Sequence, residues 1–226
     1  VVKLRDAGML EQLRRSTSTK SLGMKGHPIE LAAGQFSQMI DNSPESLNGV
    51  ACPSGGTSWW RRFYFSEHAG VGASTRISQV TIGTEDGTSR TATINVYSIP
   101  HGVTVDTIPL DQLTLLGSGT GAVGGTLTTS TIELDDPVDI ADTSAVDLVV
   151  EYNVASSAGF FPAGNSTTQT HPTFISSTTC SIADPTDAAN VGAGFPDFHI
   201  IMIVDYGDVT PPGTGCGSPS NVAWLS

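Results

Sequence analysis

Two strand-like runs bracket a long segment without helical periodicity in the second half of the chain. Val146–Val154 alternates apolar and polar side chains, and His199–Asp205 is the most apolar run of the sequence. A period of two is typical of a β-strand with one buried face. The segment between these runs is rich in Gly, Pro, Ser, Thr and Asn, residues that favour turns and loops. The pattern predicts an antiparallel β-sandwich with a long excursion between two core strands.

Five earlier runs extend the strand pattern. The turn residues Glu85-Asp86-Gly87 predict a hairpin between two of these strands, and the glycine-rich stretch 118–124 predicts a link between two others. The first run has aromatic residues and arginines on both faces, so we expect another segment to cover it. Together these runs predict an all-β fold, a jelly-roll sandwich of about eight antiparallel strands. The five runs are Trp59–Phe65, Arg76–Gly83, Arg90–Ile99, Leu113–Gly117 and Gly125–Leu134.

The sequence divides into three segments. Residues 1–50 are interpreted as an N-terminal arm, in which apolar residues at three-residue steps predict a short amphipathic helix within the first 20 residues. A second short helix is expected at Pro28–Ile40. Residues 51–208 form the sandwich. Residues 209–226 are interpreted as a Pro/Gly-rich linker followed by a strand-like run, which is either the start of a fibronectin type III-like domain or a tail packed on its own domain or on a neighbour's.

The charge is unevenly distributed along the chain. The net charge is −12, from 10 basic and 22 acidic residues. Residues 1–25 hold six of the basic residues and have a balance of +4, whereas no Lys or Arg follows Arg90 and 14 acidic residues do. An acidic body repels the phosphate backbone, which argues against nucleic acid as a partner. No apolar stretch approaches the roughly 20 residues of a membrane-spanning helix.

The three cysteines are too few and too widely spaced for a zinc-finger motif. We expect a disulfide between Cys52 and Cys180, which would tie the first strand region to the excursion and stabilise the fold by roughly 3–5 kcal/mol. The alternative is a pair of buried free thiols. Cys216 lies in the C-terminal Pro/Gly-rich segment and would have its partner elsewhere. A disulfide in a lysine-poor chain rich in Thr, Ser and Gly indicates an extracellular protein.

Three motifs in the sandwich region resemble a module of bacterial secreted proteins. The strand Leu148-Val149-Val150-Glu151 is followed by a loop that contains glycine and asparagine, and then by Cys180–Asp187, with the pattern C-x-x-x-x-P-T-D. Gly194–His199, with the pattern G-F-P-D-x-H, leads into the last strand. The resemblance covers about residues 52–207. Such modules are accessory β-sandwich domains of large extracellular or cell-surface proteins. The resemblance therefore implies a location outside the cell or on its surface, and no single catalytic activity.

Carboxylates near the last strands are candidate metal ligands. Asp184, Asp187 and Asp197, with carbonyl groups of the surrounding loop, would supply oxygen ligands to a calcium ion. The sequence has no EF-hand spacing, and an Asp-Pro-Thr-Asp segment is commonly a turn in which a carboxylate caps backbone N–H groups. His171 and His199 have no fixed spacing to an acidic residue, and we interpret them as hydrogen-bonded structural residues. No other cofactor is expected.

Aromatic side chains are the candidates for binding a ligand such as a glycan. Aromatics are only 7% of the chain, so core packing is the alternative for most of them. The sequence has no Gly-x-Ser-x-Gly elbow and no oriented Cys–His pair, and we expect the protein not to be an enzyme. A glycoside hydrolase that uses Glu67, Glu133 and Glu151 is the remaining catalytic alternative. The candidate ligand-binding residues are Trp59, Trp60, Tyr97, Phe160 and Phe161.

These observations favour a non-enzymatic extracellular module that acts by binding or by assembly. In one version it is an accessory domain that recognises glycan or protein through the loops of residues 155–172, for example as the carbohydrate-binding domain of a secreted hydrolase. In the other it is a structural subunit, and the basic arm of one copy lies on the acidic sandwich of the next. The uneven charge motivates the second version. The expected partners are other copies of the chain or neighbouring domains of a larger surface protein.

Overall fold

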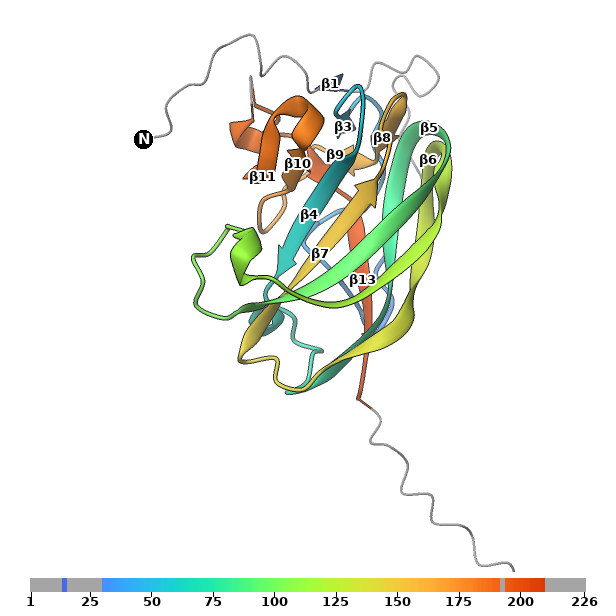
Figure 1. The fold of residues 1–226 in the computed structure, drawn as a ribbon. Coiled ribbons are helices and arrows are strands. Elements are labelled where there is room, and N and C mark those ends of the chain that lie inside the picture. The colour runs from blue at the N-terminus through green and yellow to red at the C-terminus, as the bar shows by residue number, and fades with distance from the viewer. Residues whose placement is uncertain (1–13, 16–29, 192–193, 210–226) are drawn as a thin grey trace, which may run out of the picture.

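The computed structural model describes residues 14–15, 30–191 and 194–209. In these residues regular structure consists of β-strands and short 3-10 helices, and no helix is long and apolar enough to cross a membrane. All strand pairs are antiparallel, which confirms the predicted all-β antiparallel class. Nine strands form one curled sheet and four form two small sheets (Figure 1). The elements are β1 (Arg14–Arg15), β2 (Gln35–Ser37), β3 (Val50–Ala51), β4 (Thr57–Phe63), η2 (Phe65–Glu67), β5 (Thr75–Pro100), η3 (Leu110–Gln112), β6 (Thr114–Ile140), β7 (Val146–Val154), β8 (Phe160–Pro162), β9 (Gly164–Asn165), β10 (Phe174–Ser177), η4 (Thr178–Cys180), β11 (Ile182–Asp187), η5 (Ala188–Asn190), β12 (His199–Ile200) and β13 (Met202–Gly207).

Two long strands connect the layers of the fold. β5 pairs with β6 on one edge, and on its other edge it pairs in turn with β13, β8 and β7. β5 therefore bends between its two halves, and the sheet curls around the core like half a barrel (Figure 1). The resulting strand order is β11-β10-β4-β7-β5-β13-β2, with β6 and β8 beside β5. A jelly roll has two separate sheets, whereas one continuous sheet forms both layers here.

The hairpin predicted at Glu85-Asp86-Gly87 is wrong, because these residues lie within β5. Glu85 is fully buried, and its carboxylate accepts hydrogen bonds of 2.5–3.0 Å from the backbone N–H groups of residues 47–49. Shifts in strand register on either side of these residues accommodate the bend of β5. The stretch 118–124, predicted as a link, is likewise part of the single strand β6. Thirteen strands are described, where about eight were expected.

Part of the predicted arm belongs to the sheet. Gln35–Ser37 form β2 and pair with β13, so the short helix predicted at Pro28–Ile40 is wrong. The reason is tertiary, because Phe36 is buried and packs edge-on against Phe63 at 5.3 Å between ring centroids. Gln38 also donates a hydrogen bond to the Arg62 carbonyl. The expectation that another segment covers the aromatic strand is thus confirmed.

Several predictions concern residues outside the described ranges. The amphipathic helix of the first 20 residues is among them, except that Arg14–Arg15 form β1 and pair with β3. The linker, the fibronectin-like strand and Cys216 lie in residues 210–226, which are also outside.

The core lies between the two layers of the curled sheet. Inward side chains such as Trp59, Ile94 and Tyr152 are fully buried in it. The predicted disulfide between Cys52 and Cys180 is present and fastens the excursion to the start of β4. A smaller apolar cluster lies on the outer face of β4 and β7, where the segment 101–113 covers the sheet: Trp60, Ile99, Ile108, Val149 and Phe174.

Candidate functional site

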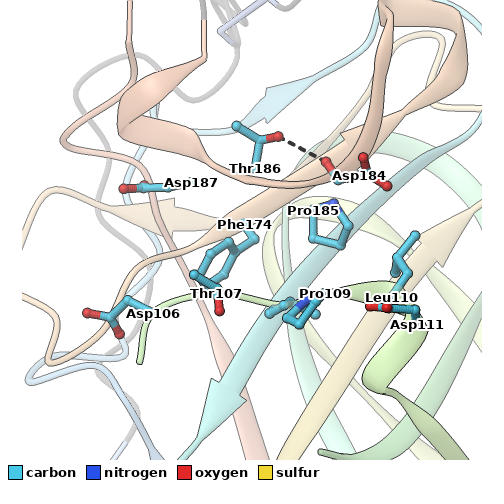
Figure 2. Close-up of a pocket in the computed structure, with 11 residues that line it drawn as sticks. Asp106, Thr107, Pro109, Leu110, Asp111, Phe174, Asp184, Pro185, Thr186 and Asp187 are labelled. Carbon is cyan, nitrogen blue, oxygen red and sulfur yellow. Dashed lines mark hydrogen bonds between the residues drawn. The ribbon is translucent and has the colours of Figure 1, made fainter. Parts of the chain in front are cut away.

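A cleft of about 510 Å³ opens between the segment 106–111 and β11, beside β10 (Figure 2). Its floor is apolar, since Phe174 and Ile108 are both only 3% exposed and two prolines lie next to them. No Lys or Arg is among the lining residues, all of which belong to the described part of the chain. In Figure 2 two carboxylates lie at each end of the cleft, with Phe174 and Pro185 between them. They are Asp106 and Asp187 at one end and Asp111 and Asp184 at the other.

Arg62 of β4 fixes the wall that carries Asp106. Its buried guanidinium pairs with Asp147, with 2.7 Å between Nη2 and Oδ2. It also donates hydrogen bonds of 2.8–3.1 Å to three backbone carbonyls of the segment 103–107. Because a guanidinium donates in fixed directions within one plane, these bonds hold the irregular segment in one conformation.

His171 connects the same wall to η2. Its Nδ1 lies 2.7 Å from Asp106 Oδ1, and its Nε2 lies 2.9 Å from both carboxylate oxygens of Glu67. Carboxylates only accept hydrogen bonds, so both contacts are hydrogen bonds only when the ring is an imidazolium. The ring packs on Tyr64, whose hydroxyl accepts a 2.8 Å hydrogen bond from the Asp106 backbone N–H. Asp106 is therefore held in place from two sides.

β11 supplies the opposite wall. Asp187 caps η5, because its carboxylate accepts hydrogen bonds from Ala189 N (3.0 Å) and Asn190 Nδ2 (2.9 Å). Thr186 Oγ1 donates to the backbone carbonyl of Asp184 at 2.9 Å (Figure 2). The side chains of Asp184 and Asp111 are exposed. Asp106 is exposed as well but pairs with His171, so Asp111 and Asp184 are the exposed carboxylates of the cleft that have no side-chain partner in the described residues.

The three predicted calcium ligands are only partly brought together. Asp184 and Asp187 line the cleft, whereas Asp197 does not, and its carbonyl accepts a 2.8 Å hydrogen bond from Asn48. Within the described ranges, no group of three or more His, Cys, Asp or Glu residues is arranged to hold a metal ion. The capping role of Asp187 agrees with the turn interpretation of this segment. Both ring nitrogens of His199 contact backbone carbonyls, as expected for a structural histidine.

The predicted ligand-binding aromatics are mostly core residues. Trp59 and Phe160 are fully buried and Trp60 is 5% exposed, while Tyr97 and Phe161 are partly buried. Trp60 lies beside Tyr97, with 5.9 Å between the ring centroids. Trp59, Trp60 and Phe160 therefore offer no exposed aromatic surface to a sugar, and they are core residues.

The three glutamates considered for hydrolysis have different environments, and none lines the cleft. Glu67 contacts His171, which in turn contacts Asp106 of the cleft. Glu133 is exposed on β6, and Glu151 is buried on the outer face of β7. Burial and the Glu151 charge raise the pKa of Tyr97, so this phenol stays protonated and donates to the carboxylate. The donors to Glu151 are Ser58 (2.6 Å), Asn95 (2.8 Å) and Tyr97 (2.9 Å).

Sequence reasoning missed Asp106 and Asp111, which form half of the acidic lining. Their only signal is two aspartates in a short segment that contains a proline. Nothing in the sequence places this segment next to β11, because the contact depends on the Arg62 and His171 hydrogen bonds.

Comparison with known proteins gives little further information. No protein-family model matches the chain, and no curated protein matches it. Among solved structures, the chain is similar to the cysteine protease and lectin-like domains of Cwp84, a surface layer associated protein of Clostridium difficile, with a TM-score of 0.39 and 11% identity. The similarity covers 79% of this chain and 37% of that chain. At this TM-score and identity it carries no inference about function.

Proposed function

We propose that this chain is a non-enzymatic module of a secreted or cell-surface protein, and that its cleft binds a cationic segment of a partner protein. The observation that carries the proposal is the cleft lining, with four carboxylates around an apolar floor and no Lys or Arg. Lys and Arg side chains fit such a surface, because their aliphatic stems pack on apolar groups while their charged ends meet carboxylates.

The fixed walls of the cleft support a binding role. Arg62 and His171 hold one wall, and the capping bonds of Asp187 hold the other. A site that is ordered in advance loses less conformational entropy when its ligand binds. The disulfide supports the extracellular location, since disulfides persist in oxidising compartments.

Residues 1–25 of another copy are one cationic segment of the required kind. Their charge balance of +4 opposes the acidic remainder of the chain. In this version the segment of one copy enters the cleft of the next, which is a head-to-tail contact, and Arg14–Arg15 leave β3, with which they pair in their own chain. High salt would weaken it, because screening reduces attraction between exposed charges. A basic segment of a neighbouring domain is the other version.

Titration with a synthetic peptide of residues 1–25 tests the proposal. We expect the peptide to bind the intact protein more tightly at low salt, and a peptide with Gln in place of every Lys and Arg not to bind. The double substitution D111N/D184N removes the charges of the two exposed cleft carboxylates that have no side-chain partner in the described residues, and it should weaken binding by roughly five- to tenfold. The matched control D135N/D136N removes two exposed charges of β6 outside the cleft and should leave binding unchanged.

The results of this titration test the binding site and the identity of its partner separately. Equal weakening by the two double substitutions would mean attraction to the acidic body as a whole and would contradict a site in the cleft. Binding of other Lys- and Arg-containing peptides, but not of residues 1–25, would support the cleft and reject the chain's own segment as its ligand.

A further inference from the structure

β6 has one edge without a partner strand in the described part of the chain. Its 27 residues pair with β5 alone, and it is the outermost strand along β5 (Figure 1). The backbone N–H and C=O groups of such an edge are left to solvent or to another strand.

The two end strands of the sheet differ from β6. β2 has three residues, and the six residues of β11 include Pro185 and two aspartates. Short length, proline and charge are devices that prevent pairing between sheet edges. The first half of β6, Thr114–Val123, contains no charged residue and no proline. Within the described sheet, this segment is therefore a long strand edge with neither a proline nor a charged residue to prevent pairing.

The charge distribution favours this half of β6 as a contact between copies. No charged residue lies between Asp111 and Glu133, whereas the second half of β6 carries four acidic side chains. A net charge of −12 opposes contact between two copies over most of the surface. Two copies of Thr114–Val123 meet without like charges.

The backbone of this half is held firmly from the inside. Gly119 is buried, and a Cβ placed on it would lie 2.0 Å from the carbonyl oxygen of Glu133, in the second half of the same strand. A Cβ on Gly117 or Gly121 would meet the side chain of Val138 or Ile132, at 2.6 and 2.9 Å. The inner face is therefore closed, and the edge and outer face remain for a partner, with Thr120 and Ala122 exposed and Leu115 57% exposed.

We propose that Thr114–Val123 pairs antiparallel with the same segment of a second copy, so that the two sheets become continuous. A two-fold axis perpendicular to the sheet places an edge strand antiparallel to its own copy, which makes the contact self-complementary. The basic residues 1–25 are a poorer occupant of this edge, because it has no carboxylate to attract them. The contact is independent of the cleft, which lies between the segment 106–111 and β11.

Light scattering over a concentration series tests the pairing. We expect the protein to form a dimer, and the double substitution S118K/T120K to weaken it by about tenfold, because lysines of the two copies then lie opposite one another. The control A155K/S156K adds the same charge to exposed loop residues and should leave the dimer unchanged. Thermal midpoints establish that both variants fold.

Hydrogen exchange at low and high protein concentration locates the contact. We expect slower exchange at high concentration in residues 114–123. A protein that is monomeric at every concentration would overturn the proposal, as would a dimer equally stable in both variants. Concentration-dependent protection confined to the cleft segments would also overturn it and would favour assembly through residues 1–25.

Discussion

At the scale of residues, two buried arginines of β4 organise loops that are distant in sequence. Arg62 pairs with Asp147 and holds the cleft wall. Arg61, on the opposite face, has no carboxylate partner in the described residues. Its two Nη atoms donate to Gln169, to Met39 and to the backbone carbonyls of His171 and Ile200, while its buried Nε has no partner there. Burial lowers the pKa of Arg61 to about 9. The two side chains fix both the excursion and the segment beside it.

Loss of the charge on Asp147 should be strongly destabilising. The substitution D147N leaves Arg62 buried without its counter-charge, and we expect the free energy of unfolding to fall by about 3–5 kcal/mol. Urea denaturation measures the change. The exposed pair of Arg76 and Asp139 provides the control, and D139N should have a much smaller effect because solvent screens that pair. Equal losses in the two variants would contradict the role given to burial.

His68 should make stability depend on pH. Burial lowers the pKa of His68, and its Nε2 has no hydrogen-bond partner in the described residues. The unfolded chain then binds more protons than the folded one below a pH of about 6.5, so stability should fall as the pH drops from about 6.5 to 5. H68F keeps an aromatic ring on Phe36 and should reduce this slope in urea midpoints. An unchanged slope would contradict the assignment.

At the scale of elements, alternation in the sequence predicts the buried faces but not the continuity of the strands. Val80, Ile82 and Ile94 are core residues, as the pattern of β5 indicates. The turn-like residues at Glu85 remain in the strand because a distant loop donates three N–H groups to that carboxylate. Local sequence contains no information about such a partner. The same limit applies to the helix predicted at Pro28–Ile40.

The candidate site was predictable only in part, for a similar reason. Asp184 and Asp187 stand out in the sequence and do line the cleft, although in the described residues they belong to no group of three or more His, Cys, Asp or Glu that could hold a metal ion. The aspartates of the facing wall come from a segment more than 70 residues earlier. Their position follows from tertiary hydrogen bonds to buried side chains.

The substitution G119A tests the close approach of the two halves of β6. G119A would place a methyl group 2.0 Å from the Glu133 carbonyl oxygen, and backbone cannot move aside as a flexible side chain would. We expect a loss of about 2–4 kcal/mol in the free energy of unfolding, measured with urea. T120A, at the exposed neighbouring position, is the control and should be nearly neutral. A neutral G119A would contradict the packing described.

At the scale of the whole molecule, the disulfide joins segments that are far apart in the sequence and adjoin two neighbouring strands, β4 and β10. Cys52 precedes β4 and Cys180 ends η4, with a sequence separation of 128 residues. The double substitution C52A/C180A should lower stability by roughly 3–5 kcal/mol, because the unfolded chain regains the entropy of that loop. Reduction of the parent protein should produce the same decrease in thermal midpoint. A midpoint unaffected by either change would contradict a structural role for the bond.

The most direct test of the cleft as a binding site is hydrogen exchange of the intact protein with and without a saturating Lys- and Arg-containing peptide. The account predicts slower exchange in two segments, residues 106–111 and 182–187, which form the two walls. Protection confined to the acidic run of β6, residues 133–139, or protection absent from both walls, would contradict it.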